Sequence, residues 1–196
     1  MGRGKEPQAR GLPRSSFDVT LKPLRSGPNM KINLGCGNHR MEGFIGVDRV
    51  KMDAVDVVHD LNVFPYPFCD DSIDEVHLFN ILEHLPDTIR VIEEVWRICK
   101  GGAIVRIGVP YYNSPGASAD PTHLRFFTES TFDYFTEDGA TWLSAYNYYS
   151  HARFAIHSVK LVQRSILNLL PRTMQLFLAH HFATVHSIEF TLEARK

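Results

Sequence analysis

KINLGCGNHRMEGFIGVD, residues 31–48, is the stretch that decides the fold of this 196-residue chain. Its first four residues predict a short buried strand, because an isoleucine and a leucine stand directly before a glycine turn. Gly35 and Gly37 allow positive φ and let a ligand approach the main chain, since neither carries a Cβ. Residues 44–47 predict a second strand that ends at Asp48. A carboxylate there is placed to accept two hydrogen bonds from the ribose of a nucleoside.

Two classes of nucleoside-binding protein share this outline, and one position separates them. The dinucleotide fingerprint G-x-G-x-x-G needs a third glycine, where this chain has Arg40. The stretch instead resembles the cofactor site of class I S-adenosylmethionine-dependent methyltransferases, in the residues Leu34, Gly35, Cys36, Gly37 and Asp48. A nicotinamide-binding enzyme and a glycine turn with a purely structural role are the alternatives.

A second segment extends the resemblance. Residues 55–59 predict a third strand, and Asp60 and Leu61 follow it at the position where this family holds the adenine ring. There the carboxylate accepts from the exocyclic amine, and the next main-chain NH donates to a ring nitrogen. An aspartate also caps turns well, which is the alternative for Asp60.

A third segment follows the predicted central strand, residues 73–80. The sequence NILEHL, residues 80–85, resembles the motif that comes after the fourth strand in the same family. Ligands of open α/β sheets bind beyond the carboxyl ends of the strands, near the point where the strand order reverses. We therefore expect Asn80, Glu83 and His84 to face the methionine end of S-adenosylmethionine or the incoming substrate.

The resemblance implies an α/β fold with a Rossmann-like sheet of seven strands, mostly parallel, whose last strand is antiparallel and lies beside the fifth. Residues 103–109, 153–164 and 186–194 predict the three remaining strands. A helix is expected over residues 88–100, with Asp87 as N-cap and a stop at residues 101–102, GG. Few residues separate the first three strands, so the early helices are expected to be shortened.

Methyl transfer from a sulfonium is an in-line displacement, so the protein has to hold the acceptor atom close to the methyl carbon. A hydroxyl acceptor also needs a general base, for which His123, in the long loop after the fifth strand, and His84 are the candidates. Asp120 stands close enough in sequence to orient His123. We expect no metal, because Glu83 and His84 have no further ligand cluster near them in the sequence.

The resemblance thus assigns S-adenosylmethionine binding to one set of residues, namely Leu34, Gly35, Cys36, Gly37, Asp48, Asp60, Leu61, Asn80 and Glu83.

Composition narrows the compartment and the partners. The formal net charge of -1 gives no argument for a nucleic-acid partner, and no apolar run approaches the roughly 20 residues of a membrane span. Three cysteines, far apart and in no redox or metal spacing, favour a reducing, cytoplasmic compartment.

Residues 1–29 predict a basic, mostly disordered extension, and residues 30–196 predict one domain. The apolar segment 166–185 is expected to cover the core, with a substrate lid or a homodimer face as the alternatives.

We therefore expect a methyltransferase that moves the methyl group of S-adenosylmethionine to a small-molecule acceptor, a sugar or natural-product hydroxyl, and releases S-adenosylhomocysteine. Three alternatives stay open. They are a protein or RNA methyltransferase guided by the basic extension, a nicotinamide-dependent oxidoreductase, and a cofactor-binding protein without turnover.

Overall fold

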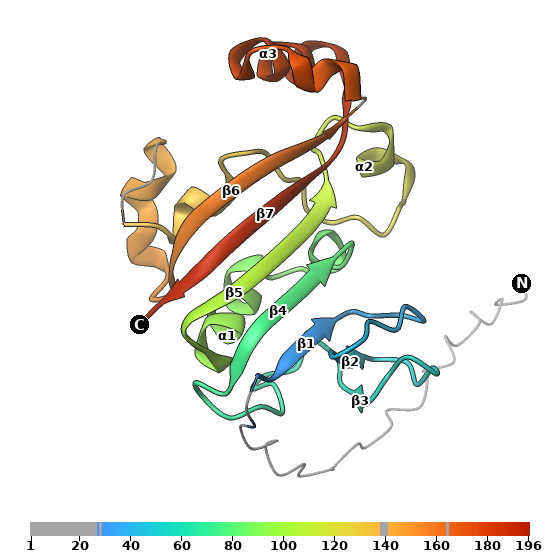
Figure 1. The fold of residues 1–196 in the computed structure, drawn as a ribbon, viewed down its shortest axis with the longest axis vertical. Coiled ribbons are helices and arrows are strands. Elements are labelled where there is room, and N and C mark those ends of the chain that lie inside the picture. The colour runs from blue at the N-terminus through green and yellow to red at the C-terminus, as the bar shows by residue number, and fades with distance from the viewer. Residues whose placement is uncertain (1–26, 28, 138–140, 164) are drawn as a thin grey trace, which may run out of the picture.

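The computed structural model describes residues 27, 29–137, 141–163 and 165–196. The extension predicted for residues 1–29 therefore lies almost entirely outside the described residues. Figure 1 shows one twisted sheet, with helix α1 against one face and helix α3 beyond one end.

The sheet has seven strands in the order β3-β2-β1-β4-β5-β7-β6. In chain order they are β1 (Lys31–Leu34), β2 (Ile45–Asp48), β3 (Val57–Val58), β4 (Ile73–Phe79), β5 (Cys99–Pro110), β6 (Arg153–Gln163) and β7 (Val185–Arg195). Strands β1 to β5 run parallel, and β7 is antiparallel to both β5 and β6. The predicted fold class is confirmed, including the last strand beside the fifth. The order reverses between β1 and β4, and open α/β sheets bind ligands in the crevice outside the carboxyl ends of their strands at such a point.

The connections between the first three strands carry no helix. Residues 35–44 and 49–56, all within the described part, form only turns and extended segments. Neither connection has the dozen or more residues that a crossover helix needs. Polar contacts brace the segments instead, because Gly46 N donates to Asp56 Oδ2 at 2.8 Å and Arg40 donates to the Asp53 carbonyl at 2.8 Å. The expected shortening of the early helices is confirmed, and it is complete at these two crossovers.

Helix α1 (Thr88–Ile98) covers one face of the sheet and begins as predicted. The Asp87 carboxylate accepts from Arg90 N at 3.0 Å, and the helix buries an apolar stripe of Val91, Ile92, Val95 and Ile98. Its predicted end is wrong, because β5 starts at Cys99 and residues 101–102 lie inside that strand. Cys99 is fully buried and pairs with Ile73 of β4, so packing draws the chain into the sheet before the glycines.

The opposite face of the sheet, toward the viewer in Figure 1, carries no helix among the described residues. Along a strand, buried side chains alternate with more exposed ones, as this arrangement requires. On β4, Val76 and Leu78 are fully buried, whereas Glu75 and His77 are half-buried on the other side. This is the inside-outside alternation of a sheet that is covered on one face only.

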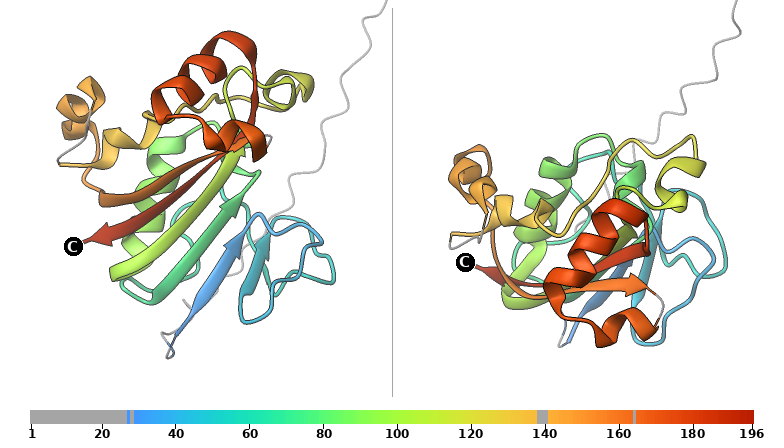
Figure 2. Two further views of the ribbon diagram at one scale, coloured as in Figure 1. Left: turned by 45° about the horizontal axis from the view of Figure 1, so that its top comes forward. Right: turned by 90° about the horizontal axis from the view of Figure 1, so that it is seen from above.

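The remaining helical segments lie at the edges and ends of the sheet. They are η1 (Leu82–His84), α2 (Pro115–Ala119), η2 (Thr131–Phe135), η3 (Trp142–Tyr149), η4 (Ser165–Leu169) and α3 (Arg172–Phe182), where η marks a 3₁₀ helix. Figure 2 shows α2 and α3 together at the end of the sheet where β4 and β5 finish. Helix α3 buries only Ala179, so residues 166–185 cover less of the core than expected. The described helices are all too short or too polar to cross a bilayer.

Candidate active site at the carboxyl end of the sheet

The glycine turn after β1 holds two glycines in left-handed conformations, with φ of 70° at Gly35 and 52° at Gly37. Their surroundings differ. A Cβ on Gly35 would lie 2.4 Å from Ile81 Cγ1, so the segment after β4 already fills that space. A Cβ on Gly37 would meet nothing within 4 Å. The open main chain that a ligand could approach is therefore at Gly37, while Gly35 permits packing within the protein.

Asp48, at the end of β2, lies beside the same turn. Its Oδ2 accepts from Gly37 N at 2.9 Å, and its Oδ1 accepts from Val50 N at 3.1 Å. A carboxylate oxygen has two lone pairs, so each oxygen keeps one acceptor position after these bonds. Asp48 therefore closes the turn and can still accept hydrogen bonds from a diol. Its contact with a ribose stays a prediction.

Leu34 and Cys36 contribute only their main chain to this crevice. Leu34 is fully buried, and the Cys36 thiol lies in the interior with Sγ 3.7 Å from the Ala54 carbonyl. Burial is the largest cause that raises the pKa of the Cys36 thiol, followed by the negative charge of Asp48. A nucleophilic or metal-binding role for this cysteine does not fit such surroundings.

Asp60 follows β3 at the same end of the sheet and caps a turn. Its Oδ1 accepts from both the main-chain and side-chain nitrogens of Asn62, at 2.9 and 3.0 Å. Leu61 is buried, and its carbonyl accepts from the Tyr66 hydroxyl at 3.0 Å. The turn-capping role is thus present in the structure, and the adenine contacts of Asp60 and Leu61 stay predictions.

Asn80 turns the chain at the end of β4. It has φ of 52°, a left-handed conformation that asparagine tolerates better than most residues. The turn leads into η1, where Leu82 is fully buried and Glu83 is only 1% exposed. Desolvation is the largest cause of the raised pKa of Glu83, and its Oε2 has no hydrogen-bond partner among the described residues. A buried carboxylate oxygen without a partner is rare and calls for a proton or a bound cation.

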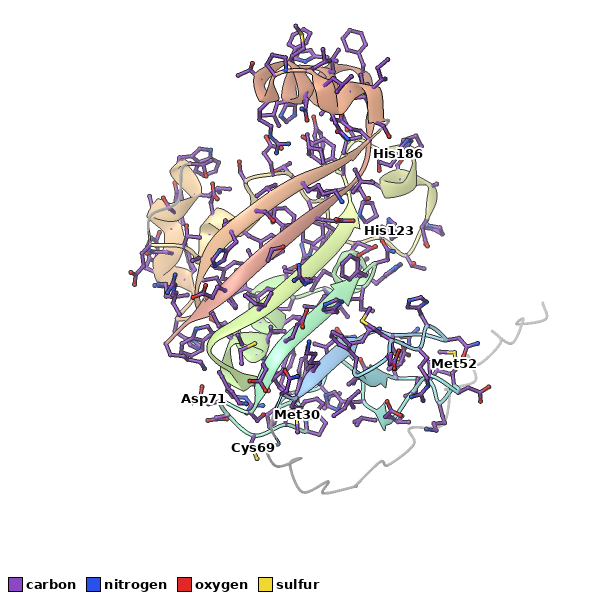
Figure 3. All side chains as sticks on the ribbon, in the orientation of Figure 1. Met30, Met52, Cys69, Asp71, His123 and His186 are labelled. Carbon is purple, nitrogen blue, oxygen red and sulfur yellow. The ribbon has the colours of Figure 1, made fainter. Side chains whose placement is uncertain are left out.

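The loop after β5 folds back over η1. Leu124 N and Arg125 N both donate to the Glu83 carbonyl, at 2.7 and 3.2 Å. The Arg125 guanidinium donates to the Pro86 carbonyl with Nε at 3.0 Å. These bonds hold His123 next to His84, with ring centroids 4.7 Å apart. Figure 3 shows His123 at the end of the sheet to which β4 and β5 point, opposite Met30 and Asp71.

The hydrogen bonds define which nitrogen of each histidine carries a proton. Thr122 Oγ1 lies 2.6 Å from Asp120 Oδ1 and 2.9 Å from His84 Nδ1. The Thr122 hydroxyl has one proton, which it donates in the hydrogen bond to the Asp120 carboxylate. In the contact between Thr122 and His84 the donor must therefore be His84 Nδ1–H. His123 Nδ1 lies 3.1 Å from the Ala117 carbonyl, which can only accept. In neutral His84 and His123 the lone pair is therefore on Nε2.

Sequence reasoning identified Glu83, His84 and His123 singly, and the fold brings them together. One ligand atom from each lies within 4.8 Å of the other two. The sequence shows no third candidate ligand beside Glu83 and His84. In the folded chain His123, from the loop after β5, lies next to them. Thr122 was missed, because its position between Asp120 and His123 in the sequence does not by itself indicate a contact with His84, 38 residues earlier.

A second polar group at this end of the sheet was also missed. It joins α3 to the start of the loop, since Asn113 Nδ2 donates to the Ala179 carbonyl at 2.7 Å. His180 lies 3.2 Å from the Tyr112 hydroxyl through Nδ1 and 3.1 Å from Glu129 Oε1 through Nε2. Ala179 and His180 of α3 are more than 50 positions from their partners in the chain, so no local pattern could have revealed the group.

Two hollows in the surface lie away from the glycine turn and from the two histidines His84 and His123. One of about 350 Å³ is lined by Phe64, Pro65, Arg90, Glu93, Glu94, Arg97 and His151. Another, of about 1050 Å³, lies over β6 and η2 and includes Trp96, Glu129, Asp133 and Arg172. Neither contains the glycine turn, His84 or His123. The crevice between β1 and β4 is thus located by its chemistry and topology, and not by an enclosed volume.

Comparison with known proteins agrees with this topology. Residues 33–107 match a family model described as a methyltransferase domain. An S-adenosylmethionine-dependent methyltransferase from Archaeoglobus fulgidus superposes with a TM-score of 0.55 at 15% identity, over 86% of this chain and 87% of that one. A chain from the complex containing the Trm112 methyltransferase activator of Haloferax volcanii has a TM-score of 0.55 at 14% identity, over 89% and 86%. The [4+2]-cyclase SpnF has a TM-score of 0.54 at 15% identity, over 89% and 78%. No curated protein sequence matches the chain.

Proposed function

We propose that this chain, whose residues 33–107 match a methyltransferase domain, transfers the methyl group of S-adenosylmethionine to a hydroxyl of a small-molecule acceptor, a sugar or a natural product. The observation that carries the proposal is the pair His84 and His123, whose Nε2 lone pairs are free and whose rings lie together where β4 and β5 end. A hydroxyl loses its proton during methylation, so a proton acceptor at this end of the sheet favours an oxygen nucleophile.

The crevice offers the contacts that the nucleoside half of the cofactor needs. We assign the ribose diol to the free lone pairs of Asp48, because its carboxylate is held beside the open main chain of Gly37. Asp60 and Leu61, beyond β3, are assigned to the adenine ring, and Asn80 and Glu83 to the methionine end. When bound, S-adenosylmethionine supplies an electrophilic methyl carbon on a sulfonium.

The chain's own task is to place the acceptor oxygen and to take its proton. The oxygen forms a bond to the methyl carbon while the carbon–sulfur bond breaks and its electron pair goes to sulfur, giving S-adenosylhomocysteine. The hydroxyl proton has to leave because the oxygen gives up an electron pair to the methyl carbon and would otherwise carry a positive charge. His123 Nε2 is the first candidate to receive it and His84 Nε2 the second, since both Nδ1 atoms already donate.

Cofactor binding is tested by isothermal titration of the full chain with S-adenosylmethionine, S-adenosylhomocysteine and NAD in separate experiments. Micromolar binding of the first two and none of NAD is expected. Asp48→Ala should weaken that binding by roughly ten- to a hundredfold, the range for a lost hydrogen bond to a charged group. Circular dichroism of the variant checks that the turn still folds. Absence of heat with both sulfur compounds would contradict the proposal.

The acceptor is tested by incubating the protein with S-adenosylmethionine and a panel of hydroxylated sugars and aromatic or macrolide alcohols, with mass spectrometry as the readout. A product heavier by one methyl group is expected. His123→Asn should slow turnover by roughly a hundredfold or more while cofactor affinity is retained. Methyl transfer only to protein or RNA added in parallel would overturn the small-molecule acceptor.

A further inference from the structure

We propose that Glu83, His84 and His123 bind a divalent transition-metal ion. Their ligand atoms all lie within 4.8 Å of one another, so the three side chains could hold one ion between them. Glu83 and His84 come from η1 after β4, and His123 comes from the loop after β5, so the site exists only in the folded chain. The metal site itself is independent of the proposed acceptor, whereas its role in activating a hydroxyl rests on the proposed function.

The first argument is the orientation of the histidines. A metal-bound imidazole usually donates its other nitrogen to a carboxylate, a carbonyl or a bridging group, which fixes the tautomer. Both rings already have this arrangement. His84 donates through Thr122 to the Asp120 carboxylate, and His123 donates to the Ala117 carbonyl. The protein thus supports the outer nitrogens and leaves both Nε2 atoms as acceptors.

The second argument is the state of Glu83. Its side chain is 99% buried by accessible surface, and its Oε2 is unpartnered among the described residues. No Lys or Arg among them forms an ion pair with it. Asp120 Oδ2 lies 3.9 Å from His123 Nε2. A cation bound by Glu83 and the two imidazoles would satisfy the buried oxygen that the protein itself leaves without a bond.

The ligand set indicates the class of ion. Two imidazoles and one carboxylate suit Zn²⁺, Fe²⁺, Co²⁺ or Mn²⁺, whereas Mg²⁺ and Ca²⁺ prefer oxygen ligands. Three protein ligands leave coordination positions open for a substrate oxygen. An acceptor hydroxyl bound there would lose its proton to water more readily, and the oxygen would then attack the methyl carbon. If the ion is bound through the two Nε2 atoms, His84 and His123 would activate the hydroxyl by holding the ion, and would not accept its proton themselves.

The site is tested by titrating chelator-treated full-length protein with Co²⁺ and following its visible absorption, then displacing Co²⁺ with Zn²⁺. We expect one Co²⁺ ion to bind per chain, with a visible absorption spectrum typical of Co²⁺ bound by nitrogen ligands. Glu83→Gln, His84→Ala and His123→Ala should each weaken Co²⁺ binding by at least about tenfold. Thr122→Val, which removes only the support of His84, should weaken it by roughly ten- to a hundredfold.

His151→Ala is the matched control, because His151 also stands beside a glutamate, 3.4 Å from Glu93, but has no second histidine there. It should bind Co²⁺ like the unchanged protein. Equal binding by the control and all cluster variants, tighter binding of Mg²⁺ than of Co²⁺, or no Co²⁺ signal would each overturn the proposal. Glu83→Gln is nearly isosteric and tests the site even if the alanine variants misfold.

The same samples separate this inference from the proposed function. Cofactor binding and methyl transfer that persist in chelator with no Co²⁺ spectrum would refute the metal site alone. A Co²⁺ spectrum that disappears in the cluster variants, together with no S-adenosylmethionine binding, would refute the proposed function alone. If the ion serves the reaction, chelator abolishes turnover and Zn²⁺ or Co²⁺ restores it, whereas a histidine base would work unchanged in chelator.

Discussion

Gly35 and Gly37 are equivalent in the sequence motif but have different roles in the structure. Both adopt positive φ, yet only Gly35 lies against another side chain, that of Ile81. Ile81 belongs to the segment after β4, so Gly35 is where the two edges of the crevice touch. Gly37 faces open space beside the Asp48 carboxylate. The two residues should therefore respond differently to the same substitution.

We predict that Gly35→Ala lowers the free energy of unfolding by on the order of 3 kcal/mol, from strain at positive φ and the overlap with Ile81. Gly37→Ala should cost only about 1 kcal/mol in stability, while lowering affinity for S-adenosylmethionine by about tenfold or more. Urea denaturation and isothermal titration measure the two effects. In the Gly35→Ala, Ile81→Ala double variant the losses should be less than additive, because the overlap is removed. Strict additivity would argue against the packing role.

At the level of elements, η1 and the loop after β5 form one unit. A single carbonyl, that of Glu83, accepts from two successive amides of the loop, Leu124 N and Arg125 N. The loop is therefore positioned by two main-chain bonds, to which the Arg125 guanidinium adds its bond to the Pro86 carbonyl. This explains how a long connection can hold His123 in a fixed place beside His84.

Helix α1 follows η1 directly, and its first turn depends on one cap. Asp87→Ala should lower the free energy of unfolding by about 1 kcal/mol, because Arg90 N would lose its acceptor. Asp87→Asn keeps an acceptor oxygen, so it should lower the free energy of unfolding by only a few tenths of the loss expected for Asp87→Ala. Urea denaturation of the three proteins provides the comparison. An equal loss in both variants would mean that the charge of Asp87, and not the capping bond, stabilises the helix.

At the level of the whole molecule, the sheet has one covered and one uncovered face, and the uncovered face holds a charged cluster that joins three strands. Glu75 of β4 contacts Lys31 of β1 at 2.8 Å, Arg106 of β5 at 3.1 Å and His77 at 3.0 Å. Desolvation alone would raise the pKa of Glu75. The hydrogen bonds from Lys31, His77 and Arg106 outweigh it and lower the pKa to about 2.

A carboxylate with a depressed folded-state pKa stabilises the protein above its unfolded pKa and loses that contribution as the pH falls. For Glu75 the loss should occur between about pH 4.5 and about pH 2, with a size on the order of 2 kcal/mol. The Glu75→Gln variant should therefore be less stable than the unchanged protein near neutral pH. Between about pH 4.5 and about pH 2 its free energy of unfolding should depend less on pH. Glu189→Gln, which removes one exposed pair with Lys160, is the control and should change little. Parallel curves for wild type and Glu75→Gln would contradict the prediction.

Most of the architecture could be predicted from the sequence. The strand segments and the start of α1 at Asp87 are encoded locally, in short apolar runs, glycine turns and a capping residue, whereas the antiparallel last strand was expected from the family resemblance. The absence of early helices follows from the lengths of the first two connections. The methyltransferase interpretation also came from local motifs, and the family match over residues 33–107 favours it over a nicotinamide enzyme.

Only the tertiary structure decided which of these residues meet. The end of α1 at Ile98 depends on the burial of Cys99 against β4, and the role of Gly35 depends on Ile81, 46 positions later. The cluster of Glu83, His84 and His123 depends on the β4–β5 pairing and on a loop that returns across η1. Local sequence determines the conformation of a segment, because propensities and turns act over a few residues. Contacts between segments depend on strand register and loop path, which are set by packing of the whole sheet.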